Sequence, residues 1–144
     1  MRIAPLLAAF ALPLTLIGAA PRTVPDRETA LFVLCAGPHR TTCVVDGDTF
    51  WLRGEKIRIA DINTPETSTP ACNREAALGS AATGRLIDLL NQGPFSLAAW
   101  SGRKTDRYGR LLRVVTRGGR SIGDRLMAEG LAQPWRGRRG DWCS

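Results

Sequence analysis

The residues of this sequence best suited to chemistry are carboxylates and arginines, because it contains a single histidine, His39. Mechanisms that need a histidine pair, such as that of the histidine-pair ribonucleases, lack the residues they require. His39 lies between Pro38 and Arg40 in an expected loop, where an exposed residue without a catalytic role is the simplest interpretation. Any reaction must therefore rest on acidic and basic side chains.

Two aspartates, Asp46 and Asp48, are separated by Gly47. Side chains two residues apart on a strand point to the same face, and the glycine permits a bend between them. Such a pair can hold a hard divalent cation such as Ca²⁺ through oxygen. Because Asp-Gly-Asp is also a common turn sequence, this segment alone does not define a metal site.

Two further segments combine an arginine with a strand and a carboxylate. Arg58 lies between Ile57 and Ile59 and is followed by Glu66, and Arg110 directly precedes an apolar segment. Guanidinium groups bind phosphate oxygens in pairs, and a carboxylate can take a proton from an attacking water. The three segments together favour hydrolysis of a phosphodiester. Structural roles remain open for the three residues: Arg58 as a surface cross-strand partner, Glu66 as a solvated loop residue and Arg110 as a salt-bridge donor.

The elements that must position these residues alternate between strands and helices. A strand is expected at 31–34, an antiparallel hairpin within 43–60 with its turn at 53–56, and a loop at 61–71. Next come a helix capped by Asn73 and extending to residue 90, strands at 94–100 and 111–116 around a polar loop, and a short helix at 122–129. This order predicts an α+β fold around a small, strongly bent antiparallel sheet.

Three motifs occur in a fixed order: Val-Val-Asp-Gly-Asp-Thr at 44–49, Arg58 with Asn-Thr-Pro-Glu at 63–66, and Asp-Arg-Tyr-Gly-Arg at 106–110. Over most of residues 43–134 the sequence resembles the staphylococcal nuclease family. The resemblance implies an OB-fold, a five-stranded antiparallel β-barrel with two to three helices. It also implies hydrolysis of phosphodiester bonds in DNA and RNA, with low sequence specificity and a bound Ca²⁺.

The resemblance assigns the metal to Asp48, to the backbone carbonyl of Thr64 and to Asn63, which stands where the family usually has aspartate. An amide keeps a ligand oxygen but removes one negative charge. At about 4 Å and an effective dielectric of about 20, that charge is worth on the order of 4 kcal/mol before ion dehydration is subtracted. We therefore expect weak Ca²⁺ binding, with Asp46 and Asp61 near enough in sequence to compensate.

The same resemblance assigns the catalytic roles. Glu66 would orient or deprotonate the attacking water, while Arg58 and Arg110 would bind the phosphate and neutralise its charge. Tyr108 would shape the turn that presents Arg110, and contact with the substrate is a second role for it. Trp135 could stack on a base, which is worth roughly 1 to 3 kcal/mol, or pack on the barrel; for Trp142, packing is the simpler interpretation.

The first twenty residues have the layout of a secretory signal peptide. Arg2 is followed by an apolar stretch at 3–17 and small residues at 18–20. An uncleaved membrane anchor through residues 3–20 is the alternative. Residues 21–30 look like an exposed leader, and residues 31–144 form the expected domain. Export predicts a periplasmic or secreted protein, or a membrane-anchored one that faces the periplasm.

Behind an export signal, the four cysteines predict two disulfides, for which three pairings exist. We favour Cys35 with Cys43 and Cys72 with Cys143. A zinc site is the alternative, but the sequence has no Cys-x-x-Cys and one histidine.

The net charge of +7, about +6 without the signal, favours a polyanionic partner such as DNA or RNA, although a solvated cationic face explains it equally well. We expect a monomer with no obligate protein partner. A catalytically weakened OB-fold module that binds nucleic acid or protein is the second hypothesis, which Asn63 favours. A disulfide-bonded structural domain of the cell envelope is the third, but it does not explain the motifs.

Overall fold

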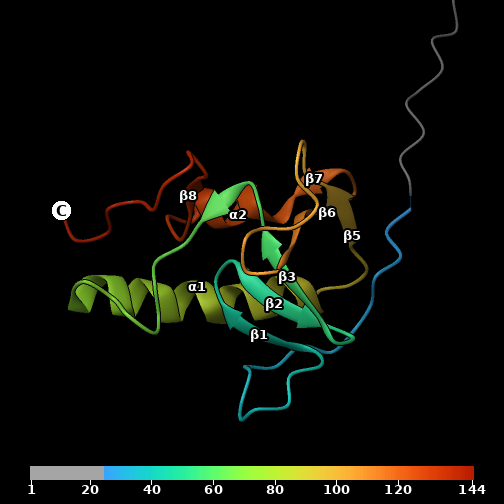
Figure 1. Cartoon of the computed structure of the whole chain (residues 1–144), viewed down its shortest axis with the longest axis horizontal. Coiled ribbons are helices and arrows are strands. Elements are labelled where there is room, and N and C mark those ends of the chain that lie inside the picture. Colours follow the sequence, from blue (N-terminus) through green and yellow to red (C-terminus); the bar gives the residue numbers. More distant parts are fainter. Residues whose placement is uncertain (1–24) are drawn as a thin grey trace, which may run out of the picture.

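The computed structural model describes residues 25–144, so the predicted signal segment lies outside the described residues. Within them the chain forms one larger sheet, a small two-stranded sheet and two helices (Figure 1). The elements, in chain order, are β1 (Cys43–Asp46), β2 (Thr49–Leu52), β3 (Glu55–Ile59), β4 (Ile62–Asn63), α1 (Asn73–Asn91), β5 (Ser96–Ala99), β6 (Leu111–Arg117), β7 (Arg120–Ser121), α2 (Ile122–Ala128) and β8 (Gln133–Pro134).

The larger sheet has the order β1-β2-β3-β6-β5, with β7 paired to β6. Its strands are antiparallel except that β3 and β6 run parallel, with Arg58 opposite Leu112. The expected α+β class is therefore correct, but the closed antiparallel barrel is not: the described sheet is mixed and open. The reason is that β4 leaves β3 to pair with β8, and the chain passes through α1 and β5 before β6 returns beside β3.

The predicted hairpin is confirmed as β2 and β3. Its turn places Arg53 at φ 50° and Gly54 at φ 85°, the left-handed conformations that a two-residue hairpin turn requires. A second turn joins β1 to β2 at Gly47, where an added Cβ would lie 2.7 Å from the Cβ of Ala82 in α1. Only glycine allows the helix to approach this turn so closely.

The strand predicted at residues 31–34 is wrong. Phe32 is the one buried side chain of the four, and its ring centroid lies 5.7 Å from Phe50 and 6.0 Å from Phe95. Leu31, Val33 and Leu34 are exposed. The backbone touches the sheet only around Val44, whose N–H donates to the Val33 carbonyl at 2.8 Å. The apolar run therefore crosses the edge of the sheet with a single anchor and does not pair along it.

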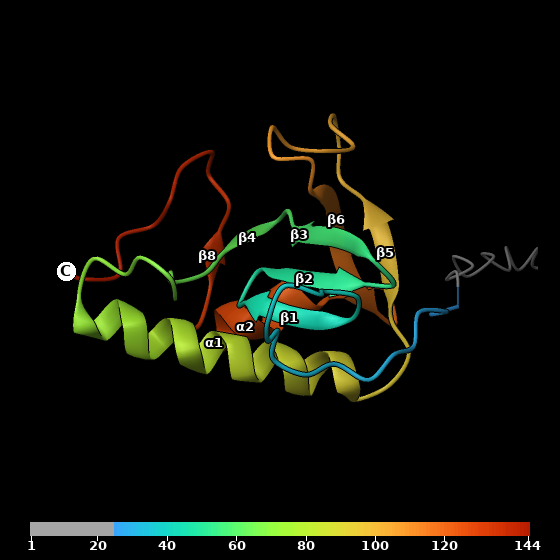
Figure 2. The same cartoon turned by 60° about the horizontal axis from the view of Figure 1, so that its bottom comes forward.

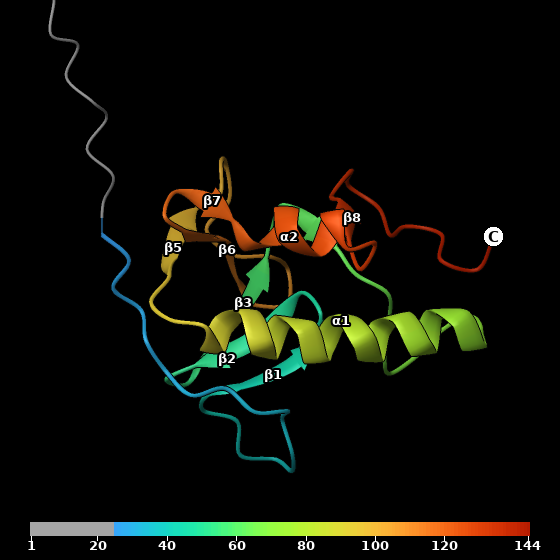
Figure 3. The same cartoon turned by 180° about the vertical axis from the view of Figure 1, so that it is seen from behind.

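Both predicted helices are confirmed. α1 lies alongside β1 and β2 (Figure 2) and buries Leu86, Leu89 and Leu90, and it passes in front of the larger sheet when the molecule is seen from behind (Figure 3). Its N-cap is Cys72 and not Asn73, because the backbone turns into the helix one residue earlier than the polar side chain indicates. α2 begins after Ser121, whose hydroxyl accepts from the Gly123 N–H at 3.0 Å.

Both favoured disulfides are confirmed. Cys35 pairs with Cys43 across 8 positions, and Cys72 pairs with Cys143 across 71. The zinc alternative is thereby excluded, since all four cysteines are oxidised. Trp142 is buried, with 8% of its surface exposed, as packing on the domain requires. Within residues 25–144, neither helix is long and apolar enough to cross a membrane.

The described part of the predicted leader lies against the sheet. The N–H groups of Arg27 and Glu28 both donate to the Phe95 carbonyl, at 3.1 and 2.9 Å. Asp26 accepts from the Ser96 hydroxyl at 2.7 Å and from the Gly118 N–H at 2.8 Å. Contacts with the sheet therefore begin before residue 31.

Candidate active site

Asp48 is the centre of the candidate site. It sits in the turn between β1 and β2 and is 8% exposed. Its Oδ2 accepts from the Thr64 N–H at 3.2 Å and lies 3.1 Å from Nη1 of Arg58. Its Oδ1 accepts from the Thr49 hydroxyl at 3.0 Å. One carboxylate therefore links the first motif to the second.

Arg58 is buried in β3, with 8% of its surface exposed. Besides Asp48, its guanidinium donates to the carbonyls of Ile59 at 2.8 Å and Ile62 at 3.2 Å. The ring of Trp135 lies across the group, 5.0 Å from its central carbon. A buried charge is stable only when it is paired and hydrogen-bonded, and these contacts satisfy that condition and fix the guanidinium in one orientation.

Arg110 approaches the same carboxylate from the loop before β6. Its Nη1 is 3.5 Å from the Thr49 hydroxyl, a long contact that places it one side chain away from Asp48. Its Nε donates to Asp106 at 2.6 Å. Burial opposes ionisation of Asp106, but the hydrogen bonds from Arg110 and Tyr108 prevail, and the pKa of this carboxyl is lowered. Asp106 therefore keeps Arg110 oriented.

Glu66 is positioned by a carboxylate that the sequence reasoning missed. Buried Glu75, in the first turn of α1, accepts from the Glu66 N–H at 3.2 Å and from the Ala71 N–H at 2.6 Å. Gly79 completes the support, because an added Cβ there would lie 2.8 Å from the Glu66 carbonyl oxygen. The spacing Cys72-x-x-Glu75 was the available signal, since a carboxylate at the third helical position often binds backbone N–H groups before the helix.

Asp46 and Asp48 crowd together. The Asp48 N–H donates to Asp46 Oδ1 at 3.2 Å, and burial together with the charge of Asp48 raises the pKa of Asp46 to about 6, with a smaller contribution from Glu66. Three negatively charged groups thus influence one another here. A divalent cation would relieve that repulsion, so the oxygen donors of Asp46 and Asp48 fit a hard cation.

The other residues expected to hold the metal are less well placed to do so. Across residues 25–144, no three His, Cys, Asp or Glu side chains gather in a ready-made metal cluster. Asn63 is buried, and its Nδ2 has no hydrogen-bond partner and lies 3.3 Å from the position of an added Cβ at Gly140. Asp61 does not join the group, because its Oδ2 accepts from the Ser121 hydroxyl at 2.6 Å, at the start of α2.

An open cleft of about 390 Å³ lies beside the two arginines. Tyr108, 67% exposed, lies 5.5 Å from the Arg110 guanidinium, and Trp135 is 37% exposed. Aromatic faces beside guanidinium groups suit a ligand with both bases and phosphates. The lining residues are Arg58, Ala60, Trp100, Arg103, Asp106, Arg107, Tyr108, Arg110, Leu112, Trp135 and Gly137.

A second missed residue comes from the chain end. Nη2 of Arg139 lies 3.1 Å from Oε1 of Glu66. The structure thus brings Asp48, Thr64, Arg58 and Arg110 together, with Glu66 close enough to influence Asp46, and adds an arginine from the tail. No local pattern signals Arg139, because its position depends on a distant disulfide.

Comparison with known proteins identifies relatives over much of the described chain. The model of a family described as staphylococcal nuclease homologues matches residues 56–140. Two relatives from Bacillus subtilis (strain 168) are each 37% identical over 94 residues, or 62% of this chain: endonuclease YncB, of which the match covers 44%, and the SPbeta prophage-derived endonuclease YokF, of which it covers 31%. The chain therefore matches less than half the length of either relative.

A mixed sheet with two helices, and a site in which arginines pair with aspartates beside an open cleft, define a small α+β domain with a basic surface site. Since the family model covers more than half of the sequence, this chain belongs to the staphylococcal nuclease family.

Proposed function

We propose that this protein is a nuclease that hydrolyses phosphodiester bonds in DNA and RNA with low sequence specificity and with the help of Ca²⁺. The observation that carries the proposal is the continuous set of contacts from Arg110 through Thr49 and Asp48 to Arg58. Glu66 lies at its edge. Both relatives are named endonucleases, which supports the same reaction class.

The two arginines stabilise the charge that develops on the phosphate. Water attack on a phosphodiester concentrates negative charge on the non-bridging oxygens, and donors oriented in advance act on that charge without reorganising. Asp48 orients Arg58 and Asp106 orients Arg110. Low sequence specificity follows, because these groups contact the backbone of the nucleic acid and not the base edges.

Glu66 is the group that accepts a proton from the attacking water. Its backbone is fixed by Glu75 and Gly79, and its carboxylate pairs with Arg139 at 3.1 Å, so the side chain has a defined position. A Ca²⁺ held by Asp46, Asp48 and the Thr64 carbonyl would add positive charge and lower the pKa of a coordinated water. Asn63 contributes no charge to this set, so we expect weak Ca²⁺ affinity.

The decisive experiment measures cleavage of labelled DNA and RNA by the purified protein with millimolar Ca²⁺ or with chelator. Glu66→Gln should lower the rate about 10²- to 10⁴-fold, the range for loss of a general base. Glu55→Gln makes the same change at the exposed β2–β3 turn and should leave the rate unchanged. Failure of the unchanged protein to cleave at any tested Ca²⁺ concentration would overturn the proposal.

Asn63→Asp tests the metal separately. The variant should reach half-maximal activity at a lower Ca²⁺ concentration, because it restores a negative charge next to Thr64. An unchanged or higher Ca²⁺ requirement would show that this position does not act on the metal.

Asn63 also favours the second candidate, a module that binds nucleic acid or protein without cleaving it. Binding of labelled nucleic acid without cleavage by both the natural protein and Asn63→Asp would establish that alternative. Cleavage by the natural protein would exclude it, and cleavage by Asn63→Asp alone would assign the loss of activity to this position.

We further propose that the protein is exported to the periplasm or secreted. The two disulfides support this, because such bonds persist in oxidising compartments. Cell fractionation with mass measurement of the mature N-terminus tests it: loss of about twenty residues indicates cleavage, and an intact N-terminus in the membrane fraction indicates anchoring. Recovery of the protein in the cytosol with reduced cysteines would contradict export.

A further inference from the structure

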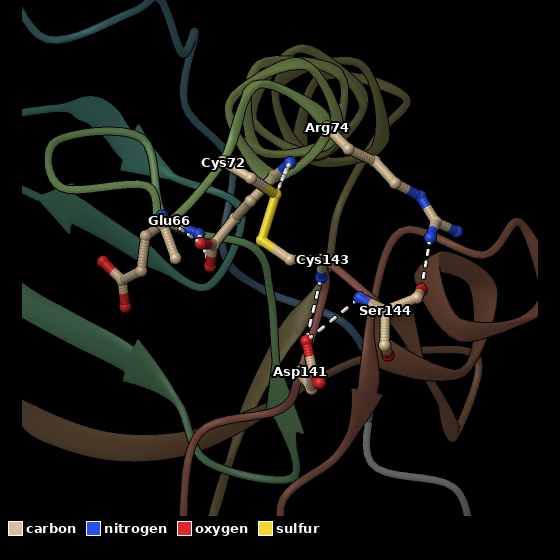
Figure 4. Close-up of a disulfide and its surroundings, with 8 residues drawn as sticks. Glu66, Cys72, Arg74, Asp141, Cys143 and Ser144 are labelled. Atoms are coloured by element: carbon tan, nitrogen blue, oxygen red, sulfur yellow. Dashed lines mark hydrogen bonds between the residues drawn. A yellow bond between two sulfur atoms is a disulfide. The ribbon is translucent and has the colours of Figure 1, made fainter.

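The last twelve residues form a strap that is fixed at both ends. At its start, β8 pairs with β4, and the Trp135 N–H donates to the Asp61 carbonyl at 2.8 Å. At its end, Trp142 is buried and Cys143 is bonded to Cys72 at the start of α1 (Figure 4). The strap therefore cannot swing away from the domain while the disulfide is intact.

Further contacts order the end of the strap. Asp141 accepts from the N–H groups of Cys143 and Ser144, at 2.9 and 3.3 Å, and the Ser144 carbonyl accepts from Arg74 at 2.6 Å (Figure 4). Gly140 packs directly against the side-chain oxygen of Gln133, so an added Cβ there would require the Gln133 side chain to move. Residues 136–140, here called the arginine loop, are thus held between defined anchors.

The arginine loop carries Arg136, Arg138 and Arg139, all exposed. They border a depression of about 460 Å³. The loop also borders the cleft beside Arg58 and Arg110, through Trp135 and Gly137. The arginine loop therefore lies between the cleft and the depression and contributes residues to both. A polyanion seated in the cleft can continue across the loop into the depression.

Arg139 is the contact between this loop and the reaction centre. It pairs with Glu66 at 3.1 Å, while 68% of its side chain is exposed. An exposed ion pair is worth little, so a phosphate can replace Glu66 as the partner of Arg139. Replacement would also free the Glu66 carboxylate for the attacking water.

We propose that the arginine loop is a second phosphate-binding subsite. It takes the phosphodiester next to the one at Arg58 and Arg110, in a single-stranded nucleic acid, and Arg139 moves from Glu66 to that phosphate when substrate binds. The cleavage part of this inference rests on the proposed function. The binding part does not, because it concerns affinity for the strand alone.

Binding is measured by fluorescence anisotropy with a labelled single-stranded oligothymidylate in chelator, over a range of salt concentrations. Arg139→Ala should weaken binding about tenfold and lower the slope of log K against log salt by about 0.7, the change for one lost phosphate contact on a single strand. Arg120→Ala removes the same charge from β7, away from both basic surfaces, and should alter affinity less than twofold. Equal affinity and slope for the two variants would overturn the subsite.

Cleavage kinetics separate this subsite from a role in merely holding Glu66. With the oligonucleotide, Arg139→Ala should raise KM about tenfold; with dithymidine monophosphate, which has one phosphodiester, KM should not change. A fall in kcat on both substrates with unchanged KM would show that Arg139 only positions Glu66. If the natural protein binds the strand with the expected slope but cleaves neither substrate, the proposed function fails and the binding subsite stands.

The disulfide gives an independent test. Cys143→Ser releases the far anchor and should weaken oligonucleotide binding as much as Arg139→Ala does, whereas the double change Cys35→Ser and Cys43→Ser should not. Unaltered binding by a folded Cys143→Ser protein would contradict the role of the strap. Should that variant fail to fold, Arg139→Ala still decides, because it leaves both anchors in place.

Discussion

Arg58 and Arg110 are proposed to hold one phosphate, yet the protein fixes them in opposite ways. Arg58 is buried in a central strand and is bonded to Asp48 and two backbone carbonyls beneath Trp135. Arg110 lies at the end of a loop, and its one close side-chain partner in the described structure is Asp106, four residues before it. The first is part of the folded core, and the second is held locally.

This difference in surroundings means that the two arginines should contribute differently to the stability of the protein, even though both are proposed to contribute to its activity. A buried ion pair costs several kcal/mol when one partner is removed, because the other charge remains without compensation. The Arg110–Asp106 pair lies within one loop and keeps 23% and 14% of its side chains exposed, so water can better compensate a charge left alone there, and its removal should cost less. Substitutions of the two arginines should therefore both impair catalysis but have very different effects on unfolding.

The largest effect is expected for Arg58→Met. It should abolish measurable cleavage and lower the free energy of unfolding by about 3 to 5 kcal/mol, since Asp48 is left charged and buried. Urea unfolding followed by circular dichroism measures the second quantity. Adding Asp48→Asn should recover part of the stability and none of the activity. A loss of stability below about 1 kcal/mol for Arg58→Met would break the comparison.

Arg110→Met should lower the cleavage rate about 10²- to 10³-fold, the range for one donor to a developing charge. Its free energy of unfolding should change by less than about 1 kcal/mol. The same two assays apply. If this variant unfolds as readily as Arg58→Met, the contrast between the two arginines is wrong.

Asp106→Asn should have a smaller effect, about tenfold on the rate, because Arg110 remains but is less well oriented. The pKa of Asp106 is lowered in the folded protein, so its stabilising contribution is complete above the ordinary value of 3.8 and is lost as the pH falls through the lowered folded value. The natural protein and the variant should therefore differ in stability at pH 6 and converge under strong acid. A constant difference across that range would exclude Asp106 as the titrating group.

The smallest effect is expected for Trp135→Phe. A smaller ring weakens the contact with the Arg58 guanidinium by roughly 0.5 kcal/mol, which should raise KM about two- to threefold with an unchanged kcat. Steady-state kinetics on single-stranded DNA measure both. A fall in kcat would instead indicate that Trp135 helps to orient Arg58 during the reaction.

Much of the fold could be predicted because local patterns determine it. The Arg53-Gly54 turn, the apolar spacing of α1 and the serine before α2 each depend on neighbouring residues, and all three elements were found where expected. The parallel pairing of β3 with β6 was missed, since alternation along a strand does not reveal the direction of its partner. The apolar run at 31–34 misled because hydrophobicity does not distinguish a paired strand from an edge crossing.

The residues of the candidate site also fall into two groups, those that local sequence patterns reveal and those that they do not. Asp48, Arg58, Thr64 and Arg110 could be found because each belongs to a motif on or beside a strand. Arg139 could not, because its contact with Glu66 depends on a disulfide that joins residues 71 positions apart. The surroundings of Asn63 and Asp61 could not be predicted either, because Asn63 is paired with Gln133 of β8 and Asp61 accepts a hydrogen bond from Ser121 before α2.

The parallel pair at the middle of the sheet also dictates how the chain can reach its native state. Ile57 must meet Leu111, so the ladder between the two halves forms only after a loop of about fifty residues has closed, and such non-local closure slows folding. Until residues beyond 111 arrive, the strand that carries Arg58 is an unpaired edge, which invites association between nascent chains. The order of synthesis thus leaves the segment with the central arginine with one strand neighbour until β6 has been made.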